Sequence, residues 1–299
     1  MDIESTTKSL RPVPSFRLDQ LIPRVWTDEV NGLRKELIDF SSFVSMKKPS
    51  DLSRCLVIIS NISHFDDLAS NILTATSPTN EQWISIGRST TPVDYYVELL
   101  LMQMLTNEES KCFISCKTRS IEFNMKLIQI DDGGYYFQQT PEKLLNLARQ
   151  YKENGVIMFP KYPLFAHRYF SRAAKCLLSC APLEDLDPSR EGVETIREMQ
   201  LLLETLYLNI SACLIKQNRY EDVLSVLEYH DQREKPSEKA VYRKALAQFH
   251  LKRFEQALQT LQRINYSGIT ECATLYEKIR IAWKEETNQY NSMVKKMFG

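Results

Sequence analysis

The sequence predicts a two-part protein: a small α+β domain followed by an all-α array of helical repeats that ends in a capping helix. Short β-rich runs with alternating apolar residues fill residues 52–131. Helical periodicity continues from Pro141 almost to the end. Between these regions, Asp131-Asp132-Gly133-Gly134 contains the clearest chain breakers. We therefore expect an N-terminal extension with a short helix, an α+β domain and a helical array, over residues 1–50, 51–132 and 140–299.

One helix is expected in the extension. Thr27 precedes two acidic residues, and Leu33, Leu37 and Phe40 follow at helical spacing, which makes Thr27 a candidate N-cap. In the α+β domain, a short β-rich run predicts the first strand, alternation predicts three more, and helix-like spacing predicts one helix. The expected strands cover residues 56–59, 83–87, 111–115 and 123–130, and the expected helix covers residues 94–104.

A period of 34 residues organises the helical half. Asn209, Ser211, Tyr220, Val223 and Leu227 lie 34 positions before Arg243, Ala245, Phe254, Ala257 and Leu261. This period and pattern are typical of helix-turn-helix repeats of the tetratricopeptide class, which stack to share one core. Thr140-Pro141 begins the first helix with an N-cap and a first-turn proline. The expected helices are 141–159, 165–178, 194–217, 220–230, 238–251, 254–264 and 271–298, with a solvated loop at 182–192.

The last expected helix carries a stripe that is suited to cover the open end of the stack. Leu275, Ile279, Ala282 and Trp283 recur on one face. A terminal repeat exposes its apolar face unless a capping element covers it. We therefore expect the C-terminal helix to act as a cap.

Composition excludes several classes of function. The 299 residues contain 38 basic and 38 acidic side chains, so bulk charge indicates neither a nucleic-acid nor a membrane-surface binder. The seven scattered cysteines indicate reduced thiols in a cytoplasmic protein, and the pairs Cys112/Cys116 and Cys176/Cys180 lack the histidines and polar setting of a zinc site. No secretory signal, membrane span, phosphate loop or nucleophile motif is recognised. We expect no cofactor and no metal.

The layout resembles the multidomain FK506-binding immunophilins, which join an isomerase-like domain to three tetratricopeptide repeats and a long helix. Four segments carry the resemblance, together with a long insertion between the first and second repeats. They are Lys152–Phe159, Leu206–Cys213, Glu238–Ala245 and Tyr290–Phe298, and the insertion lies around Pro182–Gly192.

The resemblance implies a peptide-binding site. Repeats of that family bind the acidic C-terminal peptide of heat-shock protein 90 through a clamp of basic and amide side chains around the terminal carboxylates. The matching positions are Lys152, Asn209, Lys239 and Arg243. Lysine, asparagine and arginine all donate to carboxylates. Val156 departs from the pattern, because many clamps carry an amide there.

The α+β domain resembles an FK506-binding domain more weakly. An active domain of that class has a tyrosine on a long loop before its last strand, whereas Cys116–Ser120 joins almost directly to Ile121. Phe65-Asp66-Asp67 resembles a Phe-Asp pair of the active pocket. We expect an inactive peptidyl-prolyl isomerase domain that serves as a scaffold.

Three functions follow from these observations. The first is a non-catalytic co-chaperone or adaptor that binds the tail of heat-shock protein 90 or the 70-kDa chaperone together with an unidentified client protein. The second is a divergent but active peptidyl-prolyl cis-trans isomerase. The third is a scaffold whose repeat groove binds a non-chaperone partner, including a germline small-RNA-pathway adaptor.

Overall fold

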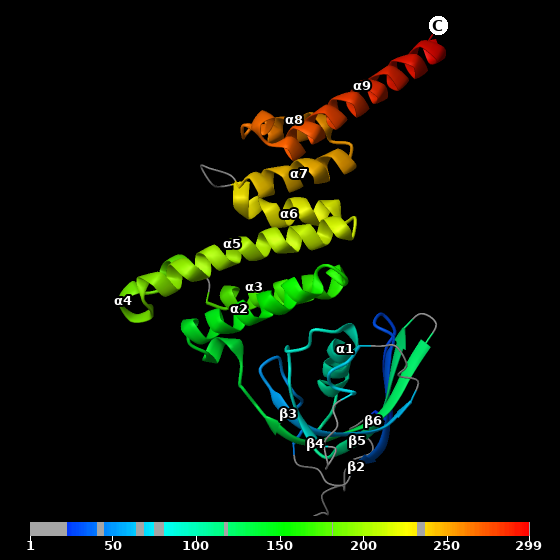
Figure 1. The fold of residues 1–299 in the computed structure, drawn as a ribbon, viewed down its shortest axis with the longest axis vertical. Coiled ribbons are helices and arrows are strands. Elements are labelled where there is room, and N and C mark those ends of the chain that lie inside the picture. Colours follow the sequence, from blue (N-terminus) through cyan, green and yellow to red (C-terminus); the bar gives the residue numbers. More distant parts are fainter. Residues whose placement is uncertain are drawn as a thin grey trace, which may run out of the picture. The chain divides into compact units, whose positions relative to one another are not determined.

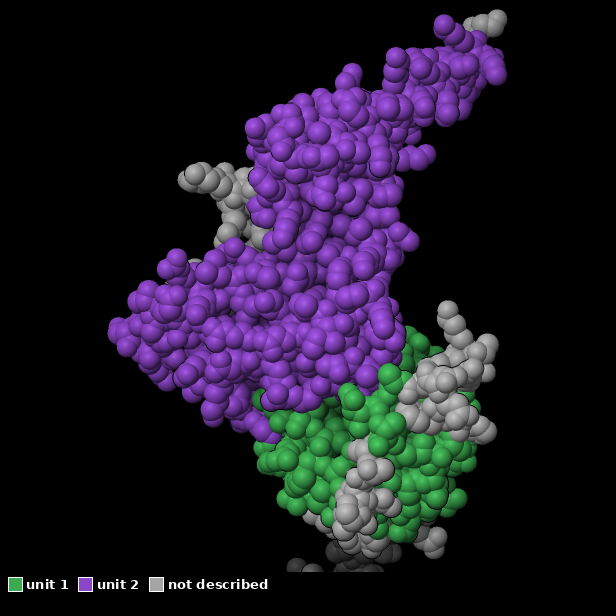
Figure 2. Space-filling view, viewed as in Figure 1, with its two compact units in different colours: residues 1–86, 96–132 green, residues 87–95, 133–299 purple. Residues whose placement is uncertain are grey.

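The structure is a computed structural model that describes residues 23–40, 45–63, 69–74, 81–116, 119–180, 182–231 and 237–298. The chain forms two compact units, which Figure 2 shows in different colours. Unit 1 contains residues 1–86 and 96–132, and unit 2 contains residues 87–95 and 133–299. Within the described residues, no helix combines the length and the apolar content that a membrane crossing needs.

Unit 1 is built on a six-stranded antiparallel sheet with the strand order β1-β2-β5-β6-β3-β4. The strands are β1 (Val25–Asp28), β2 (Leu33–Phe40), β3 (Arg54–Ser63), β4 (Glu81–Ser85), β5 (Glu108–Cys116) and β6 (Arg119–Asp131). The sheet curves, and α1 (Pro92–Leu101) lies on its hollow side (Figure 1). Val97, Leu100 and Leu101 of α1 are fully buried. The four strands and the helix expected between residues 56 and 130 are therefore confirmed.

The helix expected after Thr27 is wrong, because this segment forms the β1–β2 hairpin. Burial alternates along β2: Leu33 and Lys35 are buried and Arg34 between them is exposed. Lys35 is accepted in the interior because its ammonium pairs with the buried Glu108 carboxylate. A strand is recognised in a sequence by apolar residues at every second position, and here one of those positions is a lysine.

Unit 2 is a stack of antiparallel helices (Figure 1). Thr140 is the N-cap of the first helix, since its side chain accepts a hydrogen bond from Lys143 N at 3.4 Å, and Pro141 fills the first helical position. The insertion between the first two helical pairs was expected to be a loop, but it also contains a 3-10 turn (Leu183–Asp185) and the short α4 (Pro188–Glu191). The longer helices are α2 (Pro141–Met158), α3 (Pro163–Leu178), α5 (Val193–Lys216), α6 (Tyr220–Asp231), α7 (Glu238–His250), α8 (Phe254–Leu261) and α9 (Thr270–Phe298).

The 34-residue repeat is confirmed by the backbone as well as by the core. The turns after α5 and α7 each contain a residue with a φ of 58°, Asn218 and Lys252, and these lie 34 positions apart. Each turn is closed by the equivalent hydrogen bond, from Arg219 N to Leu214 O at 3.0 Å and from Arg253 N to Gln248 O at 2.8 Å. The small and large apolar positions of the repeat are buried in both pairs: Ser211, Val223 and Leu227 in the first, Ala245, Ala257 and Leu261 in the second.

The start of α9 caps this stack. Leu275 and Ile279 are buried in one cluster with Val241, Phe254 and Leu261. Ala282 lies at the edge of the cluster, whereas Trp283 remains 40 % exposed. The expected capping stripe is therefore confirmed for its first three positions, and the cap ends before Trp283.

Unit 2 also includes a segment that precedes it by some forty residues in the sequence, residues 87–95. Asn154 Nδ2 of α2 donates to Gly87 O at 2.9 Å, and Tyr95 packs edge-on against Phe165 with ring centroids 5.3 Å apart. The sequence has no local signal for this grouping, because the contacts of residues 87–95 depend on partners far along the chain.

Candidate functional site

A small cavity lies on one face of the helical stack, where three successive repeat pairs meet. Its volume is about 110 Å³, well below the roughly 300–1,000 Å³ of pockets for drug-sized ligands. It therefore has room for a side chain or a chain end rather than for a large cofactor. Six residues from α2 and its C-cap, α3, α5 and α7 line it: Val156, Phe159, Phe170, Asn209, Ala212 and Arg243.

The repeat period brings the two polar lining residues together. Asn209 of α5 and Arg243 of α7 occupy equivalent repeat positions, so they project from adjacent helices in the same way. The apolar wall depends on a glycine. A methyl group on Gly155 of α2 would lie 2.5 Å from Phe170 Cε1, so only glycine lets α2 pack this closely on the Phe170 ring. Phe170 then forms one side of the cavity.

Arg243 is held in place by α5. Its Nη1 donates to Leu208 O and, at 3.4 Å, to Ser211 Oγ. Its remaining N–H groups have no partner among the described residues, and no described carboxylate forms an ion pair with it. Partial burial lowers the pKa of Arg243, and the nearby Cys213 thiol opposes that shift. An arginine stays protonated in proteins, so the cavity holds a cation to which the described part of the chain supplies no ion-pair partner.

Further groups make the surroundings of Arg243 positive. Lys216 of α5 places Nζ 4.2 Å from the centre of the Phe159 ring, a cation–π contact. Burial raises the pKa of the Cys213 thiol to about 12, so this group adds no negative charge at neutral pH. The cavity with its rim can therefore accept an anion.

The two lysines of the expected clamp lie outside the cavity lining. Lys152 precedes Val156 by one turn of α2 and is half-buried, and Lys239 precedes Arg243 by one turn of α7 and is exposed. Neither has a hydrogen bond or an ion pair within the described part of the chain. The structure thus brings Asn209 and Arg243 into one cavity, and a binding role for all four residues stays a prediction.

Sequence reasoning missed four residues at this site. Phe159 lies three positions after Val156, and Ala212 and Lys216 lie three and seven positions after Asn209, so helical spacing places them on the same faces. That spacing is a signal that the sequence contains. Phe170 has no such signal, because its position depends on the packing of α3 against α2.

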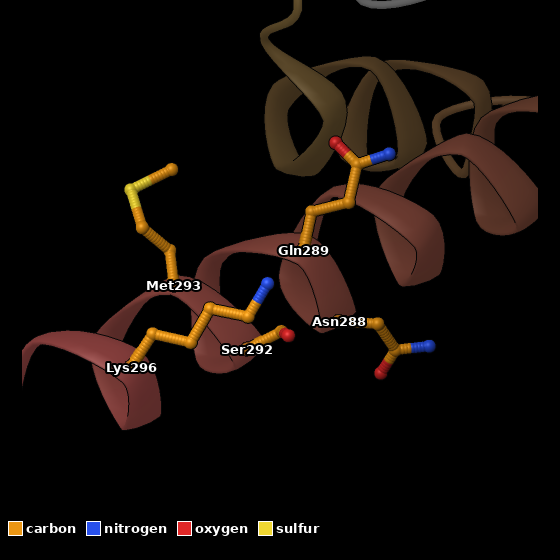
Figure 3. Close-up of a pocket in the computed structure, with 5 residues that line it drawn as sticks. All are labelled: Asn288, Gln289, Ser292, Met293 and Lys296. Carbon is orange, nitrogen blue, oxygen red and sulfur yellow. The ribbon is translucent and has the colours of Figure 1, made fainter. Parts of the chain in front are cut away.

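A second hollow, of about 480 Å³, lies along the C-terminal turns of α9 (Figure 3). Its lining residues all come from this one helix: Asn288, Gln289, Ser292, Met293 and Lys296. Because no second element among the described residues lines it, we regard it as an exposed helix face and place the candidate site in the cavity around Arg243.

The fold and this cavity define the class of protein: an FK506-binding-like domain joined to tetratricopeptide repeats. Residues 26–132 match the family model described as BDBT FKBP like N-terminal. Residues 140–225 match the model described as Bride of doubletime-like, TPR domain. The chain belongs to the Bride of doubletime-like family.

Two relatives illustrate this membership. The protein Bride of doubletime of Drosophila melanogaster is 33 % identical over 291 residues, which cover 94 % of this chain and 100 % of that protein. A crystal structure of residues 1-211 of CG17282 is 31 % identical with a TM-score of 0.60, and the match covers 68 % of this chain and 98 % of that one. The expected resemblance to FK506-binding proteins with tetratricopeptide repeats is thereby confirmed.

Proposed function

We propose that this protein is a co-chaperone or adaptor whose repeats bind the C-terminal carboxylate of a partner protein. The observation that carries the proposal is Arg243, a partly buried cation beside Asn209 that has no carboxylate partner in the described chain. A hydrogen bond to a charged group contributes about 1.5–3 kcal/mol, and desolvation of the site favours the upper part of that range. An anionic chain end fits both the small volume and the charge.

The proposed partner is the acidic tail of heat-shock protein 90 or of the 70-kDa chaperone. Lys152 and Lys239 each lie one helical turn, about 5.4 Å, from a cavity residue, where they meet the acidic side chains that precede a terminal carboxylate. Six cysteines of the described residues are free thiols, in keeping with a reducing compartment, and we propose the cytoplasm. We further propose residues 140–299 as the extent of the repeat array.

Calorimetric titration of the full chain with the peptide Met-Glu-Glu-Val-Asp tests this function. We expect Arg243→Ala to weaken binding at least about tenfold, which is 1.4 kcal/mol. Lys239→Ala should weaken it less because that side chain is exposed. Lys278→Ala on α9 removes the same charge away from the cavity and serves as the control. The absence of heat would remove the chaperone tails as partners, and equal affinities for Arg243→Ala and the natural chain would remove the carboxylate-binding function.

We also propose that unit 1 does not catalyse prolyl isomerisation. Cys116 pairs with Arg119 in the β5–β6 register, so two residues connect these strands. Active relatives of this class carry the pocket tyrosine on a long loop at this point, and two residues cannot form one. The Phe-Asp pair at residues 65–67 lies outside the described residues. Detectable isomerisation of a prolyl peptide by the full chain would overturn this proposal.

We propose a client for unit 1 and the surface of unit 1 that binds it. The name of the Drosophila melanogaster relative pairs it with doubletime, and we propose a counterpart of doubletime as the client here. β1 is an edge strand, and its hairpin exposes Val25, Val30 and Ile38, a surface suited to strand or apolar contacts. Val30→Asp should abolish co-purification with that counterpart, whereas Ile62→Asp on β3 should leave it intact. Equal recovery with both variants would exclude this surface.

A further inference from the structure

We propose that the cavity around Arg243 selects partners whose last residue is aliphatic, with acidic residues before it, over partners that end in aspartate or glutamate. The proposal rests on the carboxylate-binding part of the proposed function, since it concerns the chain end that the same cavity binds, and it ranks aspartate-ended chaperone tails below aliphatic-ended partners. It assigns the terminal side chain to an apolar wall and the terminal carboxylate to a separate polar pair.

The apolar wall is the larger part of the cavity. Val156, Phe159, Phe170 and Ala212 are four of its six lining residues. Val156 is 52 % exposed although it is a β-branched apolar side chain directed at the cavity, so a ligand would bury it. Burial of apolar surface favours association. An aliphatic side chain on the ligand therefore gains from this wall.

The polar part of the cavity is sufficient for one carboxylate. α5 already holds Nη1 of Arg243, which leaves Nε and Nη2 to form a fork toward the ligand, and the Asn209 amide adds a donor. A terminal aspartate brings a second carboxylate, and that group would lie against the wall at Val156. A carboxylate moved from water to an apolar surface without a partner is strongly disfavoured.

None of the described lysines lines the cavity, so Arg243 and Asn209 are its polar groups. Lys216 Nζ lies over the face of the Phe159 ring, and Lys152 and Lys239 lie one helical turn outside the lining. These lysines are placed for acidic residues earlier in the ligand. The site is therefore suited to bind an acidic segment that ends in valine, leucine or isoleucine with a free carboxylate.

The test measures the affinity of the full chain for Met-Glu-Glu-Val-Leu and Met-Glu-Glu-Val-Asp by calorimetry. We expect the leucine-ended peptide to bind at least about tenfold more tightly. Val156→Asn supplies an amide donor where the wall is apolar and should reduce or invert that preference. Ile157→Asn is the matched control, because Ile157 is the next residue on α2, is 61 % exposed and does not line the cavity. It should keep the natural preference.

The outcomes separate the two proposals. If both peptides bind and aspartate is preferred, or if Val156→Asn and Ile157→Asn leave the same ratio of affinities, the terminal selectivity is wrong while the carboxylate-binding function stands. If neither peptide binds to the natural chain, both proposals are wrong. A leucine preference that only Val156→Asn removes supports the assignment.

Discussion

Gly155 links the packing of the first helical pair to the cavity, and replacing it with alanine should destabilise the protein. On an open helix surface this change stabilises by about 1 kcal/mol, because glycine is a poor helix former. Here the added methyl group would lie 2.5, 2.7 and 2.9 Å from Phe170 Cε1, Cδ1 and Cζ. Overpacking of this kind costs about 1–3 kcal/mol. The difference predicts a net loss of up to about 2 kcal/mol.

Urea unfolding of the full chain, followed by the helical circular dichroism signal, measures this loss. The Phe170→Leu background is the control, because a smaller side chain there makes room for the methyl group. In that background Gly155→Ala should stabilise by about 1 kcal/mol, the ordinary helix-propensity gain. If Gly155→Ala stabilises the natural chain by the same amount, the close approach of α2 to Phe170 does not exist, and the cavity wall built on it is wrong.

Three further predictions concern the two units. Lys35→Met leaves the Glu108 carboxylate buried without its cation and should cost about 3–5 kcal/mol in urea unfolding, and a loss below about 1 kcal/mol would contradict the buried pair. Burial and neighbouring cations lower the pKa of His167 in the folded protein. In the unfolded chain the imidazole is protonated below its ordinary pKa of about 6.5, whereas in the folded chain it stays neutral to lower pH. Stability should therefore fall as the pH drops from about 7.5 toward 5.5, and a His167→Gln variant with an equally steep decline would refute this. Phe254→Ala should cost about 3–5 kcal/mol and speed amide hydrogen exchange around Ile279, and unchanged exchange would show that the cap does not depend on α8.

Local sequence patterns were sufficient to predict most helices and strands of both units. Alternation in β4, β5 and β6 and the 34-residue period in α5 to α8 reflect faces that are buried by neighbours with the same periodicity. The β1–β2 hairpin was missed because one of its inward positions is Lys35. Its burial is stabilised by Glu108, which lies 73 positions away, and no local pattern announces such a partner.

The candidate site also has a part that the sequence predicts and a part that it does not. Asn209 and Arg243 could be placed together from sequence because repeats stack with a fixed offset. The wall could not, since Phe170 reaches the cavity only through the close packing that Gly155 allows. Residues 87–95 group with the later helices although no local pattern indicates it, because Gly87 and Tyr95 find their partners on α2 and α3.

The central claim is that the repeats bind a free chain end through Arg243. The most direct measurement compares one peptide, Met-Glu-Glu-Val-Leu, as the free acid and as the C-terminal amide in calorimetric titrations of the full chain. We predict that the amide binds at least about tenfold more weakly, and that Arg243→Ala binds the two forms equally. Equal affinity of the natural chain for acid and amide would contradict the claim.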